Sequence, residues 1–342
     1  MLLKERRQNN YDFLRLFASI CVMFYHSFAL LDKVNEEPST LLTNGKVSAA
    51  LIGLSIFFSI SGYLIAGSAL RSPTMINYLW KRLLRIQPLL ILLCIVTILV
   101  LGPVCSSFSA SDYFSEVHTW TYFRNVMPVF GLQYTLPGVF THSPAGAGVN
   151  GSLWTLVAEE RLYLVMCILF ILKSRKKAFV ICILFLNVVF VVYKVSLFDI
   201  SIPYFDGLPF FYALVFLNSA LLYLLGIHFR NGLYYYLASG ILIFSIGIIF
   251  TWTEVLACYS MPLMINSLAH IKGFLNNAGK WGDFTYGTYV FAYPIQQILI
   301  GNYNFNQPYY LFIATLLITF PLAILSWNLI EKRFLKLKKI VQ

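Results

Sequence analysis

The sequence predicts an all-α integral membrane protein, a bundle of about ten transmembrane helices with both termini in the cytoplasm. Hydrophobic residues make up 59% of the 342-residue chain and charged residues only 11%, with a mean hydropathy of +0.74. Soluble globular proteins contain about 25% charged residues, so the composition excludes that class. Two further observations support the prediction: apolar runs of about twenty residues recur along the chain, and lysine and arginine gather in alternate connections.

Each apolar run is long enough to cross roughly 30 Å of hydrocarbon as a helix. The candidate spans are residues 12–31, 47–70, 83–104, 152–172, 178–195, 207–228, 232–251, 254–271, 284–301 and 308–330. We expect a single membrane domain over residues 1–342, without a fused soluble domain. The longest connection, residues 105–150, is rich in aromatic residues, proline and glycine, so we expect it to fold over the extracytoplasmic side of the bundle as a lid or a partly re-entrant segment.

The basic residues set the orientation of the bundle. With the N-terminus inside, the cytoplasmic segments contain Lys4, Arg6, Arg7, Arg71, Lys81, Arg82, Arg85, Lys173, Arg175, Lys176, Lys177, Arg230, Lys272, Lys280, Lys332, Arg333, Lys336, Lys338 and Lys339. The outer segments keep only Lys33, Lys46, Arg124 and Lys194. This bias and the anionic inner leaflet explain the net charge of +11 without a nucleic-acid partner. We therefore expect a multi-pass protein of a bacterial-type inner or plasma membrane, in contact with its lipids.

The six cysteines lie in or beside apolar spans and form no CxxC or metal-like spacing. They are expected to be packing residues, and no metal site is predicted.

The first functional pattern lies in the first span, where Asp12, Arg15 and His26 interrupt a hydrophobic run. Asp12 and Arg15 are three residues apart, close enough to pair on a helix. Arg15 and His26 share one helical face to within roughly 20° and are separated by about 16 Å along the axis. Ionisable residues in a span are functional candidates, and a neutral imidazole is a typical general base. The packing alternative is a buried ion pair, or a histidine bonded to a helix carbonyl.

The second pattern is the run from Phe57 to Tyr63 in the second span, which contains Ser61 and Gly62. Small residues let membrane helices approach closely. Taken alone, the run is more typical of packing than of chemistry, and we assign Ser61 and Gly62 a supporting role.

The third pattern is a basic cluster of Lys81, Arg82 and Arg85 at the cytoplasmic end of the third span. Arg82 and Arg85 are three residues apart and present two guanidinium groups that can bind phosphate bidentately. The positive-inside bias alone also produces such a cluster. Its location on the same membrane side as Arg15 favours a phosphate site.

The fourth pattern is a pair of adjacent acids, Glu159 and Glu160, in the run from Trp154 to Tyr163 that enters the fourth span. Carboxylates are costly at this position, and Glu159 and Tyr163 share a helical face. A carboxylate here can orient the imidazole of His26 or bind sugar hydroxyls. The alternative is an interfacial charge cluster that ends the loop.

In this order the motifs resemble the membrane-bound acyltransferase-3 family. Two later segments agree: Thr285 to Ile295 looks like the ninth-span motif of the family, and Ser326 to Lys332 like its closing motif. The resemblance covers essentially the whole chain. In one departure, Ala292 stands where many relatives have a histidine before the proline, which leaves His26 as the candidate base. The other histidines are expected at membrane interfaces: His118, His142, His228 and His270.

The resemblance implies transfer of an acyl group, most often acetyl, from cytoplasmic acyl-CoA to a hydroxyl of a surface polysaccharide or its lipid-linked precursor. The donor phosphates would be held by the basic residues Arg15, Lys81, Arg82 and Arg85. His26 would deprotonate the acceptor hydroxyl or first relay the acyl group, with Glu159 or Glu160 orienting it. The supporting residues are Asp12, Ser61, Gly62, Trp154 and Tyr163. A separate polysaccharide-assembly protein is an expected partner if transfer does not finish in the membrane.

Two alternative functions fit ten spans and basic inner loops. A transporter or flippase of lipid-linked sugars predicts paired, Gly/Pro-broken spans in corresponding halves, which the sequence does not contain. A glycan polymerase or ligase would carry its catalytic groups in the long outer loop and would not need a phosphate site at the inner end of a span.

Overall fold

The computed structural model describes residues 9–172, 176–195, 207–280 and 282–339. Within these ranges the regular structure is helical, and the β-type pairing is an isolated bridge between Ser106 and Val139. Five of the basic residues that predict the orientation of the bundle lie outside the described residues: Lys4, Arg6, Arg7, Lys173 and Arg175. The all-α prediction is confirmed for the described part of the chain.

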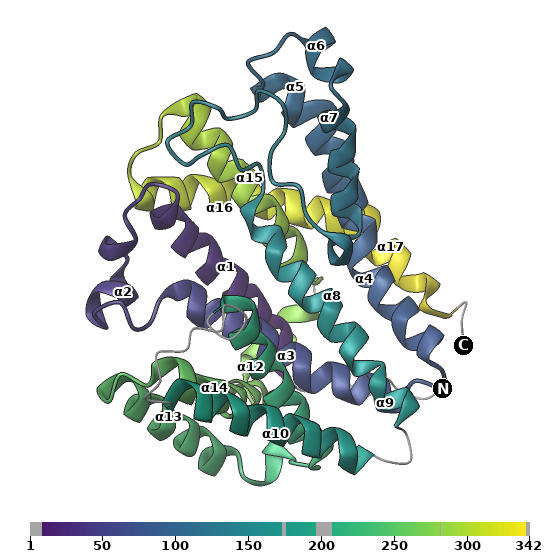
Figure 1. Cartoon of the computed structure of the whole chain (residues 1–342), viewed down its shortest axis with the longest axis vertical. Coiled ribbons are helices and arrows are strands. Elements are labelled where there is room, and N and C mark those ends of the chain that lie inside the picture. Colours follow the sequence, from purple (N-terminus) through teal and green to yellow (C-terminus); the bar gives the residue numbers. More distant parts are fainter. Residues whose placement is uncertain (1–8, 173–175, 196–206, 281, 340–342) are drawn as a thin grey trace. The chain divides into compact units, whose positions relative to one another are not determined.

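The predicted apolar segments are helical over most of their described residues (Figure 1). In chain order they are α1 (Tyr11–Ala29), α3 (Ala49–Arg71), α4 (Met75–Val96), α8 (Trp154–Met166), α10 (Lys176–Val195), α12 (Leu208–Leu224), α13 (Leu233–Ile249), α14 (Thr253–His270), α15 (Thr285–Tyr303) and α16 (Pro308–Ser326). The fourth segment is interrupted after Met166 and resumes as α9 (Ile168–Ile171).

Four continuous helical stretches among the described residues are long and apolar enough to cross a membrane. They are Ala49–Arg71, Met75–Cys105, Lys176–Lys194 and Pro308–Lys338. The second runs from α4 through a π-helical turn (Thr97–Leu101) into α5 (Gly102–Cys105), and the fourth runs from α16 through a π-helical turn (Trp327–Glu331) into α17 (Lys332–Phe334). α1 is as long as a span, but Asp12, Arg15 and His26 lower its hydropathy.

The contacts of the chain divide it into two compact units, each assembled from segments that are distant in sequence. The first unit comprises Met1–Ala18, Leu51–Met75 and Leu164–Asp283. The second unit comprises Ser19–Ala50, Ile76–Tyr163 and Phe284–Gln342. Boundaries between the segments fall within the helices α1, α3, α4 and α8.

The first unit is held together by neutral polar groups among apolar side chains. α13 and α14 lie side by side (Figure 1), and α14 also packs on α12. The side-chain amides of Asn187 and Asn218 exchange two hydrogen bonds, and the amide of Asn266 donates to Ser219 Oγ at 2.8 Å. Pro262 lacks an N–H and so leaves the carbonyl of Cys258, one turn earlier in α14, without its helical donor. Asn218 Nδ2 donates to that carbonyl at 3.0 Å.

Gly62 lies where α3 meets α12 in the first unit. A Cβ at this position would lie 2.1 Å from the carbonyl oxygen of Phe216, so only glycine fits. Ser61 beside it is buried. This placement agrees with the packing interpretation of the Ser61–Gly62 pair.

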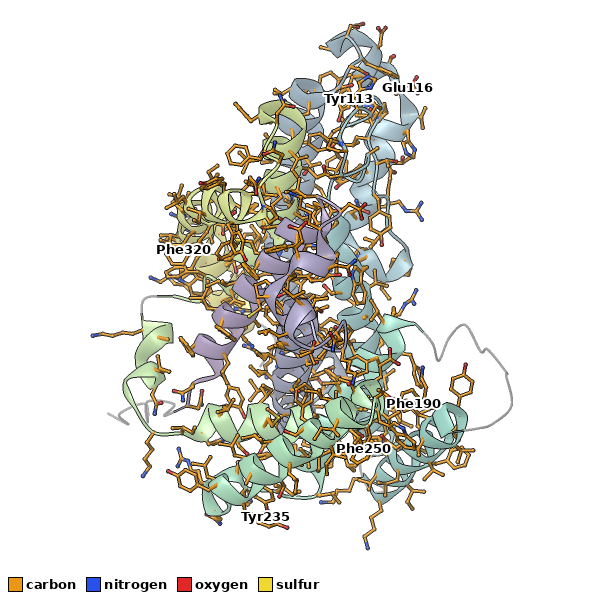
Figure 2. The ribbon with its side chains drawn as sticks, turned by 90° about the vertical axis from the view of Figure 1, so that its left-hand side faces the viewer. Tyr113, Glu116, Phe190, Tyr235, Phe250 and Phe320 are labelled. Atoms are coloured by element: carbon orange, nitrogen blue, oxygen red, sulfur yellow. The ribbon has the colours of Figure 1, made fainter. Side chains whose placement is uncertain are left out.

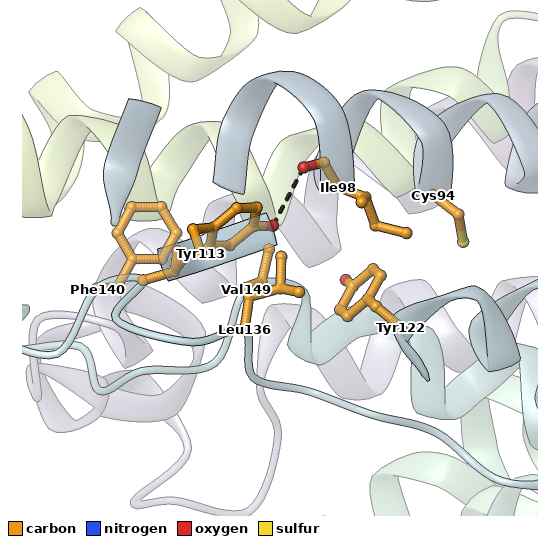
Figure 3. Packing of buried hydrophobic residues seen from close by; sticks show 8 residues of the cluster. Cys94, Ile98, Tyr113, Tyr122, Leu136, Phe140 and Val149 are labelled. Atoms are coloured by element: carbon orange, nitrogen blue, oxygen red, sulfur yellow. Dashed lines mark hydrogen bonds between the residues drawn. The ribbon is translucent and has the colours of Figure 1, made fainter. Parts of the chain in front are cut away.

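The connection predicted to lie outside the membrane, residues 105–150 (the outer segment), is folded within the second unit. It contains two short helices, α6 (Ala110–Ser115) and α7 (Val117–Thr121), followed by 3₁₀ turns Tyr122–Val126 and Pro128–Phe130. Tyr113 and Tyr122 are buried against Cys94 and Ile98 of the Met75–Cys105 stretch, and the hydroxyl of Tyr113 donates to the Ile98 carbonyl at 3.1 Å (Figure 3). The connection therefore packs onto the end of a predicted span.

Large apolar side chains are exposed along the helices. On α10, Ile181, Leu184, Phe185, Val188 and Val192 follow a helical period on one face, and all are exposed. The region of α13 likewise exposes Tyr235 and Phe250 (Figure 2). Exposed rows of large apolar side chains are covered by lipid or by a protein partner in a native protein. Together with the hydrogen-bonded polar groups inside each unit, they identify a membrane protein.

Candidate functional site

His26 is on the second-unit half of α1 and packs on α15. Its ring meets the ring of Tyr293 edge-on, with centroids 5.3 Å apart, and it also contacts the neighbouring Tyr25. Ala292, which replaces the histidine of the ninth-span motif, is the buried residue before Tyr293. An aromatic ring therefore covers one side of the predicted base.

A hydrogen bond from Asn150 connects the start of the fourth predicted span to α15. Pro294 has no N–H, so the carbonyl of Val290 one turn earlier loses its helical donor. Asn150 Nδ2 donates to this carbonyl at 3.0 Å, while Asn150 Oδ1 accepts from the N–H and the hydroxyl of Ser152. Gly151 is required between them, because a Cβ there would lie 2.7 Å from the Tyr293 ring. The motifs around Asn150 and Pro294 thus form one structure beside His26.

The beginning of α8 is fixed by a second contact with α15. Thr155 Oγ1 and the hydroxyl of Tyr289 are 2.7 Å apart, and the Tyr289 hydroxyl also donates to the Ser152 carbonyl at 3.2 Å. Trp154, the first residue of α8, is half-buried. Residues of the two motifs that the sequence singled out therefore hold α8 and α15 together.

The predicted acids of α8 have different surroundings in the second unit. Glu160 is buried; one of its oxygens accepts from Gln87 Nε2 at 2.9 Å, and the other from the backbone N–H of Val129 at 2.8 Å. Glu159 accepts a hydrogen bond from the hydroxyl of Tyr163, one turn later on α8. Glu160 thus connects α4 and the outer segment to α8, and Glu159 orients Tyr163.

Arg82 of the basic cluster lies beside the same tyrosine. Its guanidinium carbon is 5.9 Å from the centre of the Tyr163 ring, and Tyr78 on the preceding turn donates to the Tyr163 carbonyl at 3.2 Å. Arg82, Tyr163 and Glu159 therefore form a short cationic, aromatic and acidic series between α4 and α8. Such cation–π contacts orient a guanidinium without using its N–H groups for the ring.

Two further polar residues of the second unit, Tyr286 and Glu331, are buried. The Tyr286 hydroxyl donates to the Ile86 carbonyl at 3.1 Å. Glu331 is 3% exposed and accepts a hydrogen bond from Ser326 at 3.1 Å. The sequence predicted no individual role for Glu331 or Tyr286, although an acidic residue within the closing motif was an available signal.

The N-terminal part of α4 lies against the C-terminal basic segment. Trp80 Nε1 donates to the carbonyl of Leu337 at 3.2 Å. This contact brings the lysine-rich turn Leu335–Lys339 to the residue before Lys81. Lys81, Arg82 and Arg85 are all half-buried, so this end of the second unit concentrates positive charge.

The remaining predicted residues lie in the first unit. Asp12 is exposed in the first turn of α1, where a Cβ at Gly279 would lie 2.0 Å from its carboxylate. Arg15 is half-buried one turn later. Their predicted roles stay predictions.

The other histidines are described individually. His118, His142 and His228 are exposed, and their location at membrane interfaces stays a prediction. His270 is half-buried in the first unit, with Nδ1 2.7 Å from the Asn266 carbonyl and its ring stacked on Phe229.

Comparison with known proteins decides the family. A family model described as an acyltransferase domain matches residues 8–328. The chain belongs to the acyltransferase-3 family. It is similar to an O-acetyl transferase of Shigella phage Sf6, with 30% identity over 96% of both chains. It is also similar to nodulation protein 10 of Rhizobium leguminosarum bv. viciae, with 27% identity over 97% of this chain and 94% of the relative. No solved structure matches the chain. The predicted family and enzyme class are confirmed: this is an acyltransferase, and the first relative supports transfer of acetyl to oxygen.

Proposed function

We propose that this acyltransferase moves an acetyl group from cytoplasmic acetyl-CoA to a hydroxyl of a surface polysaccharide or of its lipid-linked precursor. The observation that carries the proposal is His26 packed on α15 in the unit that also contains the basic end of α4. Similarity to an O-acetyl transferase supports acetyl as the group and oxygen as its acceptor. We further propose ten spans with both termini inside, in a bacterial-type inner membrane, because the basic residues alternate accordingly.

The donor site in this proposal is the cytoplasmic end of α4. Acetyl-CoA carries several phosphate charges, and Lys81, Arg82 and Arg85 supply an ammonium and two guanidinium groups for them. The C-terminal basic segment held by Trp80 adds charge at the same end. The role proposed for Arg15 in donor binding rests on the sequence alone.

The chemistry proposed at His26 is general base catalysis. A ring nitrogen takes the proton of the acceptor hydroxyl while the oxygen attacks the thioester carbonyl. The carbon–sulfur bond then breaks, and the CoA thiolate receives the proton from the imidazolium. Tyr293 limits the motion of the ring from one side. Glu160 contributes by holding the outer segment and α4 on α8.

The experiment that tests this function measures acetyl transfer with donor concentration as the variable. Full-length protein is incorporated in membrane vesicles, and transfer of [¹⁴C]acetyl from acetyl-CoA to the surface glycan of the host is followed. We expect Arg82→Ala and Arg85→Ala each to raise the apparent KM for acetyl-CoA by about tenfold or more, with activity restored at high acetyl-CoA, since each loses a charge-assisted hydrogen bond worth roughly 1.5–3 kcal/mol. Arg124→Ala, an exposed arginine of the outer segment, is the matched control.

Two results would contradict the proposal. If the KM for acetyl-CoA were unchanged in both arginine variants at equal protein levels, the assignment of the donor site to α4 would be contradicted. Absence of transfer by the wild-type vesicles would contradict acetyl-CoA as the donor or the host glycan as the acceptor of this acyltransferase.

A further inference from the structure

Two adjacent glutamines of α15, Gln296 and Gln297, are both fully buried in the second unit but differ in their hydrogen bonding. Gln297 uses its whole amide: Nε2 donates to the carbonyls of Gly146 at 3.1 Å and Gly148 at 2.8 Å, and Oε1 accepts from Ser143 Oγ at 3.1 Å. Gln296 uses only its amide nitrogen, and its Oε1 has no hydrogen-bond partner.

The orientation of the Gln296 amide is fixed by its surroundings on α1. Nε2 donates to the carbonyl of Met23 at 2.9 Å and to Ser27 Oγ at 2.8 Å. The hydroxyl of Ser27 itself donates to the Met23 carbonyl at 3.1 Å. If the amide were turned over, its oxygen would face the Met23 carbonyl, and two acceptors would be in contact. Oε1 is therefore the atom that lacks a partner.

A buried acceptor without a donor destabilises a protein by about 1–3 kcal/mol, so a substrate group that donates to Gln296 Oε1 would gain binding free energy. The position of Gln296 favours such a partner. Met23 and Ser27 lie one turn before and one residue after His26 on α1, and Tyr293, which touches His26, lies one turn before Gln296 on α15. The open acceptor thus belongs to the same α1–α15 contact as the proposed base.

We propose that Gln296 Oε1 accepts a hydrogen bond from bound substrate and so positions the reacting groups at His26. The substrate group is an O–H or N–H donor, either a second hydroxyl of the acceptor sugar or an amide N–H of the pantetheine arm of the acyl donor. This inference rests on the proposed function. It makes Gln296 a positioning residue, whereas Gln297 holds the end of the outer segment.

The test uses Gln296→Met, which keeps length and removes the acceptor, and Gln297→Met as the matched control. Purified full-length protein in lipid nanodiscs is titrated with acetyl-CoA by calorimetry, and acetyl transfer to the host glycan is measured in vesicles at saturating acetyl-CoA. If Oε1 meets the donor, Gln296→Met weakens acetyl-CoA binding by about tenfold; if it meets the acceptor, binding is unchanged and transfer falls by about tenfold. Gln297→Met is expected to lower thermal stability with little change in either quantity per folded molecule.

Gln296→Glu keeps the test decisive if the methionine variant folds poorly. A glutamic acid kept neutral by burial retains a carbonyl oxygen and donates its O–H to the Met23 carbonyl. We expect it to retain both binding and transfer to within about threefold. Wild-type binding and transfer in both Gln296 variants, measured per folded molecule, would overturn the inference and assign the acceptor to a water molecule. A wild-type protein that neither binds acetyl-CoA nor transfers acetyl would instead contradict the proposed function.

Discussion

Both units contain the same type of hydrogen bond, in which an asparagine donates to the carbonyl that a proline leaves without its helical partner. In the first unit Asn218 serves the Cys258 carbonyl before Pro262, and in the second Asn150 serves the Val290 carbonyl before Pro294. The surroundings differ. Around Asn218, the neutral amides of Asn187 and Asn218 are completely paired.

Around Asn150, the neighbouring residues belong to the candidate functional site. Tyr293, which contacts His26, lies beside Gly151 and so next to the Asn150–Val290 hydrogen bond, and Gln296 on the next turn of α15 has an acceptor atom without a partner. In the first unit, the hydrogen bond to the carbonyl before the proline stabilises helix packing. In the second unit, we expect the corresponding hydrogen bond to hold the helices that carry the candidate site. The following predictions separate the two roles.

The largest effect is expected from Asn150→Leu. It leaves the Val290 carbonyl without a donor and removes the acceptor of the Ser152 N–H and hydroxyl groups. We expect α8 and α15 to shift near His26 as a result. Since displacement of catalytic groups by about 1 Å can cost a hundredfold in rate, we expect acetyl transfer per folded molecule to fall by about that factor. Transfer at the wild-type rate would show that this bond does not support the site.

Asn218→Leu is expected to act on stability instead. The substitution leaves the Cys258 carbonyl and the side-chain amide of Asn187 without their hydrogen-bond partner. We expect the free energy of unfolding to fall by on the order of 3 kcal/mol. Thermal unfolding of the detergent-purified protein measures this loss. Transfer per folded molecule is expected to stay within about twofold of wild type, and a hundredfold fall would place chemistry in the first unit.

The smallest effect concerns Glu37, which caps α2 (Pro38–Leu42) outside the predicted spans. Its carboxylate accepts from the N–H and hydroxyl groups of Ser39 and Thr40. Burial raises the pKa of Glu37, but these hydrogen bonds outweigh it, so the pKa lies below the ordinary value of 4.5. The stabilisation is therefore complete above pH 4.5 and is lost as pH falls through the lowered pKa.

Glu37→Gln should lower stability by about 1 kcal/mol at neutral pH and leave acetyl transfer unchanged. The stability difference between the variant and the wild type should shrink as the pH of the unfolding experiment is lowered below 4.5. A difference that grows on acidification would contradict the assigned sign.

Much of the helical architecture could be predicted from sequence because apolar runs of membrane length leave the backbone few alternatives to helix. The interruption at Cys167 and the π-helical turns were not predicted, since they depend on local packing. The acyltransferase assignment followed from motif order. The predicted acids acquired specific partners in the structure, Gln87 for Glu160 and Tyr163 for Glu159.

The contacts that organise the site were missed because they join residues far apart in sequence. Asn150 and Val290 are separated by 140 positions, and Gln296 and Met23 by 273. A usable signal existed for the first: a proline inside a predicted span frees a carbonyl, and a buried asparagine at a helix start is a suitable donor. The sequence contains no comparable pattern for Gln296, because its proposed role depends on which atom of its side-chain amide lacks a hydrogen-bond partner.

The most direct measurement compares His26→Gln with wild type in the vesicle assay, at equal amounts of folded protein and saturating acetyl-CoA. Glutamine retains a polar side chain but cannot act as a base at neutral pH. The account predicts a fall in glycan O-acetylation of about a hundredfold or more, with acetyl-CoA binding within about threefold of wild type. Undiminished O-acetylation, read as acetyl signals in the proton NMR spectrum of the glycan, would contradict the assignment of His26 as the base.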